Sequence, residues 1–174
     1  MKNLLNFALF QAGWFACVLG AVREEMWWGP IGVTVIVALH LVVLSRAGER
    51  GRELGFILGV GVVGSLLDTG LRALEVTAYP TSPESLFVPP WIAALWFLFA
   101  TLPYHSLGWL RGRWKLAFAL GAIGGPLSYL GGVRMGAVEV GPEPLWTWVG
   151  LGVEYAVITP AMLALVRSRS DSGN

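Results

Sequence analysis

Long runs of apolar residues, separated by short polar segments, set the pattern of this chain. A helix rises about 1.5 Å per residue, so about 20 consecutive apolar residues cross the hydrocarbon core of a bilayer. By this measure the sequence predicts an all-α, polytopic membrane protein with six transmembrane helices. The predicted spans are Leu4–Val22, Gly29–Ser45, Leu54–Val76, Pro89–Leu110, Leu116–Val133 and Leu145–Val166.

The ends of these runs carry residues that are typical of membrane boundaries. Pro89 and Pro90 stand at the first turn of the fourth span, where proline is tolerated because a helix leaves that amide hydrogen unpaired. Tryptophans form belts at both interfaces of membrane proteins. Those near the ends of the predicted spans are Trp27, Trp28, Trp91, Trp109, Trp114, Trp146 and Trp148.

Lysine and arginine are distributed unequally between the two sets of loops. One side has only Arg23, Arg72 and Arg134. Because cytoplasmic loops are enriched in these residues, we expect the opposite side, and with it both termini, to be cytoplasmic. That side carries Lys2, Arg46, Arg50, Arg52, Arg111, Arg113, Lys115, Arg167 and Arg169.

The composition agrees with a membrane protein. Of the residues 55% are hydrophobic and 13% are charged, whereas about 25% are charged in soluble domains. The net charge of +1 provides no basic face for nucleic acid. Cys17 is the only cysteine and cannot form an intrachain disulfide. The length predicts one six-helix membrane domain, residues 1–167, and a disordered cytoplasmic tail, residues 168–174.

Asp68 stands out because it lies inside the predicted third span. A carboxylate near the bilayer centre costs about 3 kcal/mol on insertion scales, so it is a candidate functional group. Arg72 lies one helical turn away on the same face and is the expected partner. Two interpretations remain open. Asp68 either takes part in chemistry or cation binding, or forms a salt bridge with Arg72 or Arg134 that holds helices together.

Other polar residues fall at a similar depth. Glu154 has no basic neighbour on its own helix. It is either the partner of Asp68 in an acid–base pair or a side chain bonded to a backbone carbonyl. Gln11 lies near the midplane of the first span. On the outer side of their span midpoints, by about 2–7 Å, lie Asp68, Ser128, Tyr129 and Glu154.

The two histidines fall in the inner half of the second and fourth spans. His105 follows Pro103, which favours a kink. It is either a proton-transfer or head-group contact, or an interfacial histidine. We expect His40 to be a packing or interfacial residue. Two histidines in different helices, without cysteine or an adjacent carboxylate, are a poor set of transition-metal ligands. The sequence therefore predicts no zinc, no other metal and no cofactor.

The fifth span contains the segment Gly121-Ala-Ile-Gly-Gly-Pro126-Leu-Ser-Tyr-Leu-Gly-Gly132. Small residues allow helices to approach closely, so tight packing with a kink at Pro126 is one interpretation. A broken helix whose free amides bind a ligand is the other. Arg134 follows at the outer mouth, where it would hold an anionic head group or pair with Asp68 or Glu154.

Several of these motifs together resemble a known family. They are Phe10-Gln11-x-Gly13-Trp14, Asp68, Pro90-Trp91, Leu95-Trp96, His105-Ser106 and Gly121-Ala-Ile-Gly-Gly-Pro126-Leu-Ser128-Tyr129. On these residues, over nearly its whole length, the chain resembles an uncharacterised family of small bacterial inner-membrane proteins, domain of unknown function 2878. The resemblance implies a bacterial inner-membrane location and a setting beside lipid-modifying enzymes. It brings no established activity and therefore no catalytic residues.

The sequence thus predicts a polar cavity in the outer half of a helix bundle. The expected function is a small membrane-embedded enzyme acting on a lipid or isoprenoid. The alternatives are a small-solute or proton-coupled carrier and a structural membrane protein without ligand. Expected partners are membrane lipid, a lipid or small-molecule ligand and further copies of the chain. The catalytic candidates are Asp68, Glu154 and His105, and the ligand-binding candidates are Gln11, Arg72, Trp96, Ser128, Tyr129 and Arg134.

Overall fold

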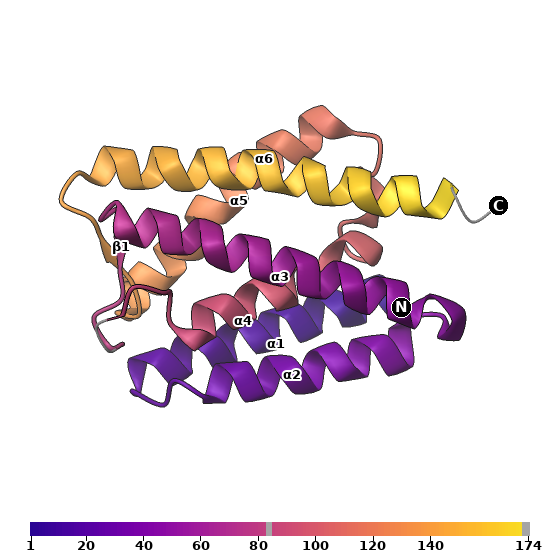
Figure 1. Cartoon of the computed structure of the whole chain (residues 1–174), viewed down its shortest axis with the longest axis horizontal. Coiled ribbons are helices and arrows are strands. Elements are labelled where there is room, and N and C mark those ends of the chain that lie inside the picture. Colours follow the sequence, from indigo (N-terminus) through magenta and orange to yellow (C-terminus); the bar gives the residue numbers. More distant parts are fainter. Residues whose placement is uncertain (83–84, 172–174) are drawn as a thin grey trace.

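The computed structural model describes residues 1–82 and 85–171 and is built from helices (Figure 1). This confirms the all-α class. The helices are α1 (Lys2–Val22), α2 (Trp28–Leu39), α3 (Arg50–Ala73), α4 (Pro90–Phe99), α5 (Trp114–Met135) and α6 (Pro144–Asp171). Between them lie the short helical turns η1 (His40–Leu44), η2 (Ala47–Glu49), η3 (Leu102–Tyr104) and η4 (Gly108–Leu110), and the strands β1 (Thr77–Ala78) and β2 (Glu139–Val140).

Each of these helices coincides with one predicted span. In the described chain, four helices are long and apolar enough to cross a membrane, and Trp28–Leu44 and Pro90–Tyr104 are shorter apolar helices. The α4 helix is shorter than predicted because of Pro103. A proline ring clashes with the carbonyl four residues earlier, and α4 ends at that residue, Phe99. The chain then continues through η3 and η4.

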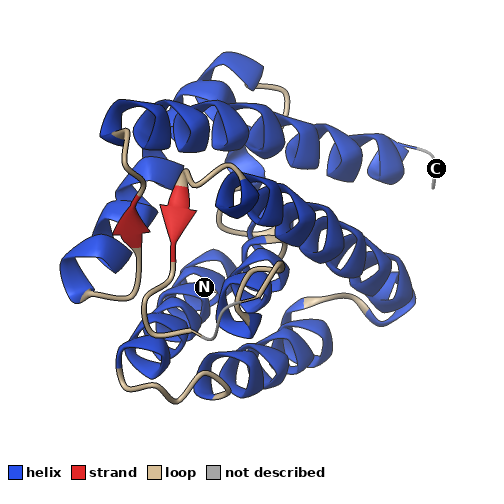
Figure 2. Cartoon of the chain, turned by 60° about the vertical axis from the view of Figure 1, so that its left-hand side comes forward, coloured by secondary structure: helices blue, strands red, loops and turns tan. Residues whose placement is uncertain are grey.

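The α4 helix occupies the centre of the bundle. It packs against α1, α2 and α3, and the α5–α6 pair lies beside this group (Figure 2). Its sequence is apolar on all sides, which is typical of a helix that is buried all round. Trp91, Trp96 and Leu98 are fully buried in it. The centre of the bundle is therefore formed by the helix with the fewest polar side chains.

The α5 helix is continuous through Gly124-Gly125-Pro126, so the chain adopts the packed rather than the broken alternative. Gly121 and Gly125 face Tyr155 of α6. A Cβ atom at Gly121 would overlap the Tyr155 carbonyl, and one at Gly125 would overlap its ring. The small residues of this segment therefore let α5 and α6 approach closely.

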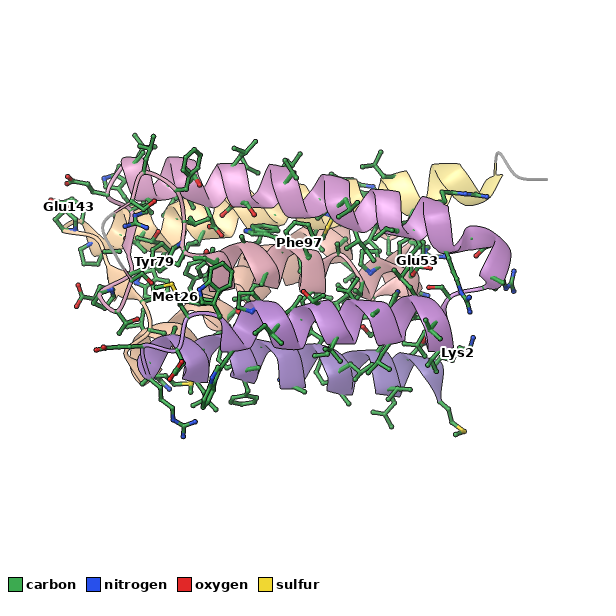
Figure 3. All side chains as sticks on the ribbon, turned by 60° about the horizontal axis from the view of Figure 1, so that its bottom comes forward. Lys2, Met26, Glu53, Tyr79, Phe97 and Glu143 are labelled. Carbon is green, nitrogen blue, oxygen red and sulfur yellow. The ribbon has the colours of Figure 1, made fainter. Side chains whose placement is uncertain are left out.

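The two ends of the bundle differ in charge. Lys2 and Glu53 lie at one end, and Tyr79 and Glu143 lie at the other (Figure 3). The loops with most lysine and arginine meet at the end with Lys2. At the end with Glu143, Thr77 pairs with Val140 and Ala78 with Glu139 in a short antiparallel ladder.

The tail that was predicted at residues 168–174 overlaps α6, because this helix ends at Asp171. Residues 172–174 lie outside the described chain.

The close approach of α5 and α6 predicts opposite effects for two neighbouring glycines. Gly121→Ala should lower the free energy of unfolding by about 1–3 kcal/mol, because a backbone carbonyl cannot move aside. Gly124→Ala should be neutral or stabilising by up to about 1 kcal/mol, because no atom lies within 4 Å of the added methyl group and alanine favours helix. Unfolding in mixed detergent micelles measures both. Equal effects of the two substitutions would contradict the observed packing.

Candidate functional site

Asp68 of α3 is enclosed by side chains from two other helices. Its side chain is buried, with 1% of the residue exposed. Trp96 Nε1 on α4 donates a hydrogen bond to Asp68 Oδ2 at 2.6 Å, and the Tyr129 hydroxyl on α5 donates one to Oδ1 at 2.6 Å. Both carboxylate oxygens are thus bonded, and one side chain joins α3, α4 and α5.

Arg72 is not the partner that the sequence suggested. Its Nη1 donates to the Phe87 carbonyl at 2.9 Å, and its guanidinium lies 5.7 Å from the ring centroid of Tyr79. Within the described part of the chain no ion pair joins Asp68 to an arginine. Burial raises the pKa of the Tyr79 hydroxyl, which therefore remains protonated beside Arg72. Arg72 thus contacts the loop at the end of the bundle that carries Glu143.

The local sequence of α3 explains how Trp96 reaches Asp68. Gly64 lies one turn before Asp68 on the same face of α3. A Cβ atom at Gly64 would overlap the Trp96 indole, and one at Gly61 would overlap the Phe97 ring. The absence of side chains at these positions brings α4 against α3. The Gly61-x-x-Gly64 spacing therefore belongs to the site as much as Asp68 does.

Aromatic side chains surround the bonded carboxylate. The Trp96 indole stacks on Tyr155 of α6, with ring centroids 5.1 Å apart and planes 19° apart. Tyr155 also contacts Tyr129 and Phe99, at centroid distances of 6.4 and 5.7 Å. Tyr155 therefore adds the fourth helix to the site. It was not among the predicted residues, although it follows Glu154 directly.

A cavity of about 480 Å³ lies against this carboxylate. Its walls come mainly from α1, α4, α5 and α6 and are mostly apolar and aromatic. Leu120 and Leu127 of α5 line the cavity and are also 45% and 59% exposed on the outside of the bundle. The cavity therefore opens sideways, along α5. Its polar lining residues are Gln11, Asp68, Ser128, Tyr129 and Thr159, and the tryptophans among its lining are Trp14, Trp91 and Trp96.

Five predicted site residues meet at this cavity, namely Gln11, Asp68, Trp96, Ser128 and Tyr129. Trp14, which the prediction left out, donates from Nε1 to Ser128 Oγ at 2.9 Å. This bond links α1 to α5 across the cavity.

The remaining predicted residues lie elsewhere. Arg134 is exposed at the end of α5 and does not line the cavity. Glu154 is half-buried outside the cavity lining, and both its carboxyl oxygens are buried without a hydrogen-bond partner in the described chain. Gly150, one turn earlier on α6, lies beside Leu71 of α3. Glu154 is therefore on the face of α6 that is turned toward α3.

His105 lies toward the opposite end of the bundle, in a second polar cluster. His40 Nε2 and Glu53 Oε1 are 2.5 Å apart, and the His40 and His105 rings have centroids 5.1 Å apart. The expectation that the histidines lack an adjacent carboxylate was wrong, because Glu53 provides one. Glu53 was missed because it immediately precedes the predicted start of the third span at Leu54, where it was taken as part of a loop.

The hydrogen bonds of Asp68 predict different roles for two neighbouring tyrosines. Tyr129→Phe should lower the free energy of unfolding by about 1–3 kcal/mol, because it leaves a buried carboxylate oxygen without a donor. Tyr155→Phe is the matched control. It removes a hydroxyl from the same aromatic cluster that makes no hydrogen bond within the described residues, and it should change stability by less than about 0.5 kcal/mol. If both variants unfold alike in mixed micelles, the Tyr129–Asp68 bond does not stabilise the fold.

Comparison with known proteins identifies a family for this chain. No curated protein and no solved structure matches the chain. A family profile, by contrast, covers residues 3–161 and so includes both polar clusters and the cavity between α1 and α5. The chain therefore belongs to the family described as Protein of unknown function (DUF2878).

Proposed function

We propose that the protein is a membrane-embedded enzyme that acts on a lipid or isoprenoid. In this proposal the apolar chain of the substrate occupies the cavity, and its reacting group lies at Asp68 and Tyr129. The observation that carries the proposal is the position of a buried carboxylate in the wall of an apolar cavity that opens sideways along α5.

The size and lining of the cavity support a lipid-like ligand. Its volume of about 480 Å³ falls within the range of about 300–1,000 Å³ that is usual for small-molecule sites. Leucines line its inner end, namely Leu102, Leu107 and Leu110. The exposed residues of its lining, Leu120, Gly124 and Leu127, are apolar and would face acyl chains rather than water. Entry from the bilayer therefore fits this lining better than entry from an aqueous side.

The polar groups are suited to acid–base chemistry. Trp96 and Tyr129 hold both oxygens of Asp68, so the carboxylate has a fixed orientation. Asp68 would accept a proton from the substrate, and the Tyr129 hydroxyl would contact the atom on which charge develops. Glu154 is the second carboxyl group that we propose to take part in proton transfer. Its oxygens have no hydrogen-bond partner in the described chain and so keep their capacity to exchange a proton.

We further propose that all the α-helices cross a bacterial inner membrane with both termini in the cytoplasm. The η1 turn prolongs α2, and η3 prolongs α4. The apolar segments Trp28–Leu44 and Pro90–Tyr104 are therefore longer than α2 and α4 alone. The basic loops lie at one end of the bundle, as the distribution of lysine and arginine in membrane proteins favours. This orientation places the Asp68 site toward the outer leaflet.

The orientation predicts which loop positions are accessible from outside the cell. In a Cys17→Ala background, Glu143→Cys should react with a membrane-impermeant maleimide in intact cells. Gly48→Cys should react only after the membrane is permeabilised, because it lies in the basic loop between η1 and α3. The reverse pattern would contradict the proposed orientation, and reaction of both positions in intact cells would contradict the number of crossings.

Blocking the cavity should remove the bound lipid. Gly124 lines the cavity and has no atom within 4 Å of its Cβ position, so Gly124→Trp should place an indole in this space. We expect the lipid retained by the purified protein to fall at least about tenfold, which corresponds to about 1.4 kcal/mol of binding free energy. Gly59→Trp on α3 is the control, because Gly59 also has open space and does not line the cavity. Mass spectrometry of extracted lipids measures the occupancy.

The same preparations test whether the protein is an enzyme. Wild-type protein incubated with a bacterial lipid extract should produce a species of altered mass. Asp68→Asn should retain bound lipid and form none of this product, because the amide keeps the size of the side chain and removes the base. If wild-type and Asp68→Asn protein retain the same lipid without any product, the cavity binds lipid and the enzymatic part of the proposal is wrong. Equal occupancy in Gly124→Trp and Gly59→Trp would overturn the binding part.

A further inference from the structure

The second polar cluster lies at the basic end of the bundle, distant from Asp68. It consists of His40 from η1, Glu53 from the first turn of α3 and His105 from the turn after η3. One ligand atom of each residue lies within 4.8 Å of those of the other two. His40 and Glu53 are almost completely buried, with 1% and 2% exposed. Charged residues are rarely buried to this extent unless they are paired or bind a metal ion.

The backbone near these residues is irregular in two places. The turn that begins at His40 is a π-helix, closed by the Ser45 amide donating to the His40 carbonyl at 3.0 Å. Single π-turns are rare in proteins, and many of those that do occur are found at functional sites. After α4 the chain bends at Pro103, and the next residues are held by Asn6 Oδ1, which accepts from Ser106 Oγ at 2.7 Å and from the Ser106 amide at 3.2 Å. These irregularities bring His105 to His40.

The cluster contains a nitrogen atom that the described residues do not use. His105 Nε2 is buried and has no hydrogen-bond partner in the described chain. Buried polar atoms of native proteins nearly always have a partner, and an exception calls for an explanation such as an ion or a water molecule. Next to the His105 ring stand a second imidazole and a carboxylate, which are the ligand types that zinc and iron prefer.

We propose that His40, Glu53 and His105 bind a divalent transition-metal ion, Zn²⁺ or Fe²⁺. Two histidines and one carboxylate leave at least one coordination position open, as in catalytic zinc sites and non-haem iron sites. Ligand atoms at about 2.1 Å from a tetrahedral ion lie roughly 3.4 Å from each other. His105 therefore moves toward the other two residues when the ion binds, and His40 and Glu53 separate to admit it.

The hydrogen bonds of Asn6 determine how tightly the ion is held. Its amide nitrogen lies 3.4 Å from His40 Nδ1, and its orientation is fixed because it donates to the Thr101 carbonyl and accepts from Ser106. If Nδ1 accepts from this amide, the ring hydrogen of His40 is on Nε2 and is donated to Glu53. Binding of an ion at Nε2 moves that hydrogen to Nδ1, where the Asn6 amide must turn its oxygen toward the ring. This rearrangement costs free energy and therefore lowers the affinity of the site for the ion.

A cavity of about 340 Å³ gives access to the cluster from the basic end and is lined by Glu53 and His105. Lys2 and Arg111 also line it. Each donates to a backbone carbonyl, Lys2 to Leu44 at 2.9 Å and Arg111 Nη2 to Pro103 at 2.7 Å. These bonds hold both side chains in place but leave their positive charge, to which Arg46 and Arg52 of the same lining add. This charge favours hydroxide or another anionic oxygen ligand at the open coordination position.

The test is metal binding by the full-length protein in detergent, with any affinity tag removed and bound metal stripped by a chelator. Titration with Zn²⁺ against a chromophoric competitor should give one site per chain. Glu53→Gln and His105→Ala should each weaken binding by more than about tenfold, since loss of an outer-shell contact alone typically weakens it by about 10–100-fold. Co²⁺ in place of Zn²⁺ should give the visible absorption of a four- or five-coordinate site.

Two control variants make the outcome specific. Glu49→Gln removes the same charge from the lining of the same cavity, and its carboxylate pairs with Arg46 at 3.9 Å rather than with a histidine. Asp68→Asn removes a buried carboxylate from the other site. Both should bind Zn²⁺ within about threefold of wild type, a difference of about 0.7 kcal/mol. If wild type binds no Zn²⁺, or if Glu49→Gln weakens binding as much as Glu53→Gln, the proposal is wrong.

Stability of the variants does not limit this test. If Glu53→Gln or His105→Ala fails to fold, the Co²⁺ spectrum of wild-type protein decides, since six-coordinate Co²⁺ in solvent absorbs far more weakly than a four-coordinate protein site. A solvent-like spectrum with wild-type protein would overturn the proposal. Because Asp68→Asn leaves this site intact, failure of the lipid experiment and failure of the metal experiment are independent.

Discussion

The Asp68 carboxylate, bonded by Trp96 and Tyr129, is the interaction on which the arrangement of α3, α4 and α5 depends. Among apolar side chains no water is at hand to satisfy a carboxylate, so its partners must come from other helices. Both donors are neutral and both bonds are 2.6 Å long. They fix the rotation of three helices about their axes, because each helix must turn one particular side chain toward the same point.

The close packing on one side of this carboxylate accompanies an open space on the other. Gly64 brings α4 against α3, and Gly121 and Gly125 bring α6 against α5. The α1 and α5 helices approach each other much less closely, and the hydrogen bond between Trp14 and Ser128 joins them. The cavity lies between α1 and α5, beside the buried Asp68 carboxylate, both of whose oxygens are bonded to side chains of neighbouring helices.

The sequence could predict the helices and the depth of the polar residues, but not their partners. Apolar runs of sufficient length indicate helices by themselves, and the 1.5 Å rise converts position into height. This placed Gln11, Asp68, Ser128 and Tyr129 at a common level. The partners depend on the rotation of each helix and on which helices are neighbours. Arg72 is one turn from Asp68, yet its guanidinium bonds to the Phe87 carbonyl, because the loop that precedes α4 lies within its reach.

The missed residues follow the same reasoning. Glu53 was excluded because the predicted span began at Leu54, four residues after α3 begins at Arg50. His105 could not be joined to His40 because a helix through Pro103 was assumed, whereas α4 ends at Phe99 and the chain continues through the short helical turns η3 and η4. Proline in the sequence indicated a kink but not its direction. The direction is set by Asn6, almost a hundred residues earlier, which bonds Thr101 and Ser106.

The separation of the two polar clusters bears on the choice between an enzyme and a carrier. Asp68 and Glu53 are fifteen positions apart on α3 (68 minus 53), which is about 22 Å along the helix. Between them the core consists of apolar side chains, among them Phe56, Ile57 and Ala100. Leucines also line the inner end of the cavity. A carrier for an ion or a polar solute would need polar groups or water along this path. An apolar barrier of this thickness favours two separate sites, one facing lipid and one facing the basic end, over a single conduit.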